Sequence, residues 1–146
     1  MDTISVVIAD TKQAARAAYL QPLRRERGIR VIGEARTRDE VIRILKRKPR
    51  ILLLDWRLVA LGGTRLLPLI RRHSPDTRII LLISRLSSAR LIDVFSGGVR
   101  GYVSRALADH ALVKAVRAVD SGQAWIPRSM VSLLVTVVNR LAHINR

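Results

Sequence analysis

The sequence predicts an α/β fold built on a five-stranded parallel sheet, with an extra helix at the C-terminal end. Short, almost wholly aliphatic runs alternate with longer segments in which apolar residues recur at helical spacing. Because the runs do not alternate polar with apolar residues, we expect helices to cover both faces of the sheet. Five such units with right-handed crossovers give a doubly wound, flavodoxin-like architecture.

The expected strands span residues 4–9, 29–35, 51–54, 78–83 and 101–104. The expected helices span residues 12–26, 38–48, 63–73, 87–98 and 108–122. Thr11 stands directly before the first helix, where a hydroxyl is typical of an N-cap.

The composition is that of one strongly basic domain. The chain has 146 residues, no cysteine, and 27 Lys and Arg against 11 Asp and Glu, a formal net charge of +16. Disulfide and thiolate chemistry are therefore excluded. The start lacks a signal-peptide pattern, and no apolar run approaches the length of a membrane span, so we expect a cytoplasmic protein with no membrane partner. The basic charge indicates either a solvated surface or direct nucleic-acid binding.

Polar side chains gather where the predicted strands end. In a doubly wound sheet the functional crevice lies at the carboxyl ends of the strands. Those ends carry Asp10, Asp55, either Ile83 or Ser84, and either Ser104 or Arg105. The pattern therefore predicts that two carboxylates and a cation from three strands meet at one edge.

The last segment, residues 125–146, forms one further helix with an apolar stripe. The stripe consists of Val131, Leu134, Val135, Val138 and Leu141. Three arrangements are open: the helix folds back onto the domain, forms the seam of a homodimer, or leads into a further domain.

Four segments in order resemble the receiver domain of two-component response regulators, most closely the NarL/FixJ (LuxR-type) subfamily. They are VVIADT, ILLLDWRLVALGG, PDTRIILLIS and GGVRGYVSRALADHALVKAVRAVDSGQAWIP. The resemblance implies a CheY-like receiver domain over residues 1–124. It also implies that residues 125–146 are the linker helix toward a DNA-binding helix-turn-helix domain, which would follow Arg146.

The resemblance implies phosphoryl transfer from a histidine kinase to Asp55, in a signalling module that is not a free-standing enzyme. Magnesium would be held by Asp10, Asp55 and the backbone carbonyl of Arg57. A hydroxyl after the fourth strand and a lysine after the fifth would contact the phosphoryl oxygens, and Tyr102 matches an aromatic switch position.

Three pocket positions depart from the family pattern. Thr11 replaces a second acid, which predicts weaker magnesium binding. Ile83 aligns with the hydroxyl position, and Ser84, one residue later, is expected to point to the opposite face. Arg105 replaces the lysine and is able to form a bidentate pair with Asp55.

These departures favour an atypical receiver, in which Asp55 is a structural acid. Signalling then proceeds by dimerisation, a partner or an anion, with phosphorylation either absent or weakened. Two alternatives stay open. Asp55 is still a competent phosphoacceptor that controls DNA binding by a C-terminal domain, or the basic surface binds nucleic acid directly.

Overall fold

The computed structural model describes residues 2–60, 65–84, 94 and 97–144, and it confirms the doubly wound sheet. Five strands pair in the order β2-β1-β3-β5-β6, and every pair is parallel. The strands are β1 (Ile4–Ala9), β2 (Ile29–Ala35), β3 (Ile51–Asp55), β5 (Arg78–Ile83) and β6 (Gly101–Ser104). Four match the predicted bounds, and β3 extends one residue further, to Asp55.

The α-helices of the described residues are α1 (Gln13–Arg24), α2 (Arg38–Ile44), α3 (Trp56–Ala60), α4 (Leu66–His73), α6 (Ala108–Asp120) and α7 (Val131–Ile144). Three single turns of 3₁₀-helix are η1 (Leu45–Arg47), η2 (Arg105–Leu107) and η3 (Arg128–Met130). The short α3 was not predicted. The helix expected over 87–98 lies outside the described residues except at 94, 97 and 98, and so does the start of the helix expected from 63.

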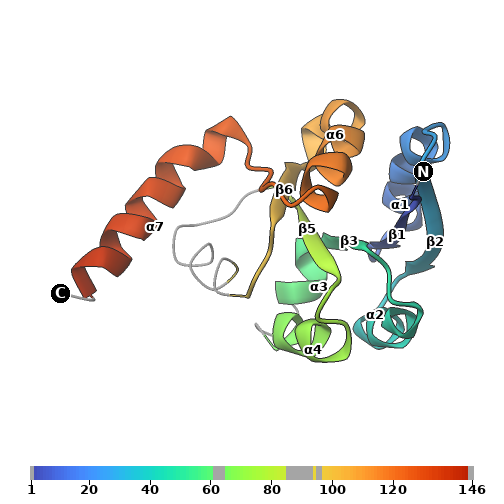
Figure 1. Cartoon of the computed structure of the whole chain (residues 1–146), viewed down its shortest axis with the longest axis horizontal. Helices are drawn as coiled ribbons and strands as arrows, with labels where there is room; N and C mark the ends of the chain where they lie inside the picture. Colours follow the sequence, from blue (N-terminus) through green and yellow to red (C-terminus); the bar gives the residue numbers. More distant parts are fainter. Residues whose placement is uncertain (1, 61–64, 85–93, 95–96, 145–146) are drawn as a thin grey trace.

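Helices cover the sheet on both faces, as the aliphatic strands require (Figure 1). One apolar cluster joins the sheet to α1 and α6, and the other joins it to α2, α3 and α4. Successive residues of β3 alternate between the two: Leu53 packs in the first cluster, Leu52 and Leu54 in the second. This alternation decides on which side of the sheet each strand-end residue emerges.

The C-terminal helix α7 extends from the body next to β6 (Figure 1). Val137 is buried in the cluster that contains α2, α3 and α4, and the partly buried Leu134 packs against it. The rest of the predicted stripe is exposed, with Val131, Val135 and Val138 about half accessible at 48%, 54% and 53%. α7 thus contacts the domain through Val137 and through one member of the predicted stripe, Leu134, while the other stripe residues stay exposed.

Within the described ranges, no helix combines the length and the apolarity needed to cross a bilayer.

Helix α2 begins with a complete capping box. The backbone N–H of Glu40 donates to Thr37 Oγ1 at 3.2 Å, and Glu40 Oε2 accepts from the N–H of Thr37, also at 3.2 Å. Glu40 Oε2 also accepts from the N–H of Arg36 at 2.6 Å, which lowers the pKa of the Glu40 carboxyl. The box satisfies N–H groups that have no partner within the helix.

We expect Thr37→Ala to lower the free energy of unfolding by about 1 kcal/mol, because a helix N–H loses its acceptor. Thr37→Ser keeps the oxygen and should stay near wild type in urea denaturation. The pKa of Glu40 is lower in the folded chain than in the unfolded one. Its contribution to the free energy of unfolding is therefore present above the unfolded pKa and is lost as pH falls through the folded pKa. Equal stability of the alanine and serine variants would contradict the role of the cap.

Candidate functional site

Two buried carboxylates emerge at the carboxyl edge of the sheet. Asp10 directly follows β1 and is 0% exposed, and Asp55 ends β3 and is 1% exposed. Each lies two residues after a side chain of the α1–α6 cluster, Ile8 and Leu53 respectively. Strand alternation therefore places both carboxylates on the same side of the sheet.

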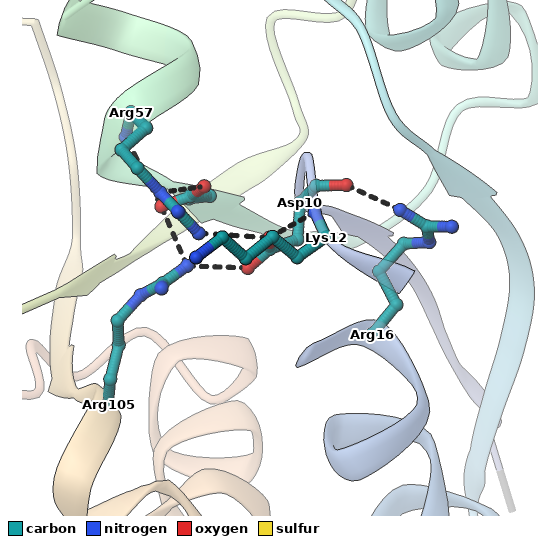
Figure 2. Close-up of polar contacts among 6 residues, drawn as sticks. Asp10, Lys12, Arg16, Arg57 and Arg105 are labelled. Atoms are coloured by element: carbon teal, nitrogen blue, oxygen red, sulfur yellow. Dashed lines mark hydrogen bonds and ion pairs between the residues drawn. The ribbon is translucent and has the colours of Figure 1, made fainter. Parts of the chain in front are cut away.

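Two arginines bridge these carboxylates (Figure 2). Arg105, the first residue of η2, places Nη2 2.6 Å from Asp10 Oδ2 and 2.8 Å from Asp55 Oδ1. Arg57, in α3, places Nε 3.0 Å from Asp55 Oδ2 and Nη2 3.3 Å from Asp10 Oδ1. Arg105 thus pairs with Asp55 through one nitrogen rather than in the expected bidentate way, and each arginine contacts both acids.

All four carboxylate oxygens are occupied. Besides the guanidinium contacts, Asp10 Oδ1 accepts from the N–H of Lys12 at 2.9 Å, and Asp55 Oδ1 accepts from the N–H of Arg57 at 3.2 Å. The second bond holds the start of α3. Two negative and two positive charges cancel, which is the condition for leaving carboxylates buried.

A third arginine, Arg16 of α1, contacts Asp10 from the side away from Arg57 and Arg105 (Figure 2). Its Nη1 donates to the backbone carbonyl of Asp10 at 2.7 Å, and its Nε pairs with Glu34 Oε1 at 3.1 Å. Arg16 is buried, and it fixes the backbone that carries one of the two acids. Sequence reasoning missed it, although Arg16, Leu20 and Leu23 recur at the spacing of one buried helix face.

Thr11 does not cap α1, contrary to the sequence prediction. The N-cap is Lys12, whose side chain makes no capping bond. Asp10 takes the N–H of Lys12 instead, because its carboxylate lies at the strand end and points back over the turn.

A cavity of about 380 Å³ opens beside Asp55, and Ser84 lines it together with Lys12 and Arg105. The prediction that Ser84 points away from the pocket is wrong. Leu82 packs in the α1–α6 cluster and lines the same cavity, so Ser84, two residues later, lies on that side. Ile83 packs in the opposite cluster and does not line the cavity.

Tyr102 of β6 lies in the core on the other side of the sheet from the carboxylates. Its hydroxyl is buried and has no hydrogen-bond partner among the described residues. Burial raises the pKa of Tyr102 to about 12, so the phenol is neutral at physiological pH.

Magnesium does not fit the donor set that these residues offer. The ion requires hard oxygen ligands at about 2.0–2.1 Å in octahedral geometry. Both carboxylates that would supply them are held by guanidinium groups, and Thr11 stands in place of a further acid. In the described residues, no three Asp, Glu, His or Cys side chains form a group suited to a metal.

Residues 6–117 match the family model of the response regulator receiver domain. The chain belongs to this family. It is 29% identical over 124 residues to the response regulator UvrY of Escherichia coli K12, covering 84% of this chain and 57% of UvrY. The chain thus spans little more than half the length of this relative.

Solved receiver structures agree with this assignment. The isolated receiver domain of RcsB from Salmonella enterica serovar Typhimurium, in its apo form, superposes with a TM-score of 0.80 at 27% identity, covering 90% of this chain and 98% of that one. A structure of two RcsB dimers bound to two parallel DNAs gives a TM-score of 0.80 at 26% identity, over 91% of this chain and 68% of that one. The resemblance to NarL/FixJ-type receivers and the CheY-like fold are both confirmed.

We expect Arg105→Met to cost about 3 kcal/mol of unfolding free energy, because it leaves buried carboxylates short of one cation. Adding Asp55→Asn should recover part of that loss by removing the uncompensated charge. Urea denaturation of the two single variants and the double variant measures this coupling. Strictly additive losses would show that Arg105 and Asp55 do not interact energetically.

Proposed function

We propose that this chain is an atypical receiver domain of a transcriptional response regulator, which signals without the standard phosphorylation of Asp55. The observation that carries the proposal is the closed network of Asp10, Asp55, Arg57 and Arg105. In it, the oxygen that would accept a phosphoryl group is already paired with a guanidinium.

The physical argument is competition for the same oxygens. A magnesium ion at this edge has to displace two arginines whose charges already neutralise the acids. It gains one carboxylate fewer than the family pattern supplies, because Thr11 replaces an acid. A displaced arginine also leaves a cation where a second cation is binding, and their mutual repulsion opposes binding. These terms support Asp55 as an acid that holds Arg57 and Arg105 in place.

Signalling then requires another route, and the exposed stripe of α7 supports association with a second copy. Val131, Val135 and Val138 follow the four-three spacing of a helix–helix seam and are about half exposed. No charged side chain falls in this spacing, although the chain as a whole carries +16. Two copies therefore meet through α7 with the least charge repulsion.

The output that we propose is DNA binding by a further domain joined to α7. The relative UvrY extends well beyond the matched region, and RcsB dimers have been solved on DNA. A histidine kinase is retained as a partner only in the alternative, in which Asp55 is phosphorylated.

With acetyl phosphate and magnesium, we expect intact-mass spectrometry to find little or no gain of a phosphoryl group. The matched variant Thr11→Asp/Arg57→Ala/Arg105→Lys restores the acid and the lysine and removes one bridging arginine. It should gain one phosphoryl group.

Adding Asp55→Asn to that variant should abolish its gain and so assign the site. A full gain by the wild-type chain that Asp55→Asn abolishes would overturn the proposal and establish the competent phosphoacceptor.

For the α7 seam, we expect Val135→Glu to weaken self-association at least about tenfold, because an unpaired carboxylate enters an apolar contact. Thr136→Glu adds the same charge next to it, on a side of α7 away from the seam, and should associate like wild type. Sedimentation equilibrium measures both. Equal dimer strength in the two variants would exclude α7 as the interface.

A further inference from the structure

A second cluster of arginines lies at the opposite edge of the sheet, where the strands begin. Arg50 directly precedes β3, Arg78 begins β5, and Arg100 directly precedes β6. The sheet register holds these positions side by side: the N–H of Arg78 donates to the carbonyl of Arg50 at 2.9 Å, and the N–H of Arg100 donates to the carbonyl of Ile79 at 2.9 Å. Three adjacent strands thus each contribute a guanidinium.

A fourth arginine reaches the same place from α4. Arg71 runs along Gly98, close enough that a β-carbon added to that glycine would lie 3.5 Å from the Cδ and Nε of the arginine. Together the four arginines line a cavity of about 620 Å³. That volume is in the range typical of small-ligand sites, whereas the charged lining is not that of an apolar pocket.

The cavity has an excess of positive charge. Two carboxylates also line it, Asp76 and Asp120, so four arginines against two aspartates leave +2. Asp120 is paired through Oδ2 with Arg50 Nη2 at 2.8 Å. The Arg50 side chain is nevertheless 41% exposed, so its guanidinium remains within reach of a solute.

Helix capping explains part of this cluster but not all of it. Arg78 Nη1 donates to the carbonyls of Val119 and Asp120, and Arg100 Nη2 donates to that of Gly122 at 2.8 Å, at the C-terminal end of α6. Each of these bonds uses one nitrogen of a group with five N–H donors. Arg71 makes no hydrogen bond or ion pair within the described part of the chain, so capping gives no account of it.

We infer that this cavity, defined by Arg50, Arg71, Arg78 and Arg100, binds a small anion that carries two or more linked phosphate groups. Neighbouring strands lie about 4.8 Å apart, so the cations from three strands spread over roughly 10 Å. That spread suits a chain of phosphates better than a single one, and guanidinium groups pair with phosphate oxygens in a bidentate way. The site is separate from the Asp55 edge and independent of the function proposed above.

A small ligand fits better than the backbone of a nucleic acid. The cations line one concave site, and Asp76 lies exposed in its lining, where it would repel a phosphate chain that continues past the cavity. A polynucleotide would instead gain from a continuous basic stripe.

The test is calorimetric titration of the 146-residue chain, at low salt in a phosphate-free buffer, with tripolyphosphate, a nucleoside triphosphate, inorganic phosphate and a short DNA duplex. Arg71→Gln removes a cavity cation that caps no helix. Arg72→Gln is the matched control: it is the next residue of α4, also exposed and of the same charge. It lines the adjoining groove, which shares Arg71 with the cavity, but it does not line the cavity itself.

We expect one tripolyphosphate per chain, weaker binding of inorganic phosphate, and an affinity about tenfold lower for Arg71→Gln. Arg72→Gln should change it less than about threefold. Tighter binding of the nucleoside triphosphate than of tripolyphosphate would identify a nucleotide as the ligand within the same proposal. Equal losses in the two variants, no binding, or tighter binding of duplex DNA with equal sensitivity to both variants would overturn it.

Discussion

Two buried carboxylates share one side of one sheet edge, and burial there requires a cation beside each of them. This constraint determines which side chains gather at the carboxyl edge of the sheet. Asp10 and Asp55 are almost fully buried, so removing them from water costs several kcal/mol per charge unless each is paired and hydrogen-bonded. Arg57 and Arg105 meet that requirement from two different elements, α3 and η2. The network therefore ties together the ends of β1 and β3 and the segment that follows β6.

The same pairing bears on whether a metal ion binds at this site. A metal ion and a pair of guanidinium groups are alternative partners for the same four oxygens. The family arrangement leaves the acids available to the ion, whereas here each oxygen already accepts a hydrogen bond or ion pair. Arg16 reinforces the arrangement by holding the Asp10 carbonyl. In the function that we propose, the acid at the end of β3 holds Arg57 and Arg105 in place.

The arginines have different roles at the two edges of the sheet. At the carboxyl edge, the charge of Arg57 and Arg105 is cancelled by buried acids. At the amino edge, Arg50 and Arg78 hold the end of α6, and positive charge is left over beside them. The high net charge therefore does not make every arginine available to an anion, because nearby carboxylates neutralise some arginines and not others.

The sequence by itself determined the α/β class, five strands with at most one residue of error, and the meeting of Asp10, Asp55 and Arg105 at one edge. Aliphatic runs and strand-end rules carry this information locally. Tertiary structure decided which side of the sheet each strand-end residue lies on and which distant residues come into contact. It placed Ser84 rather than Ile83 beside the cavity, because only residues two apart share a face. It also brought Arg16 and Arg57 to Asp10, since contacts between residues distant along the chain follow from packing, which no local pattern encodes.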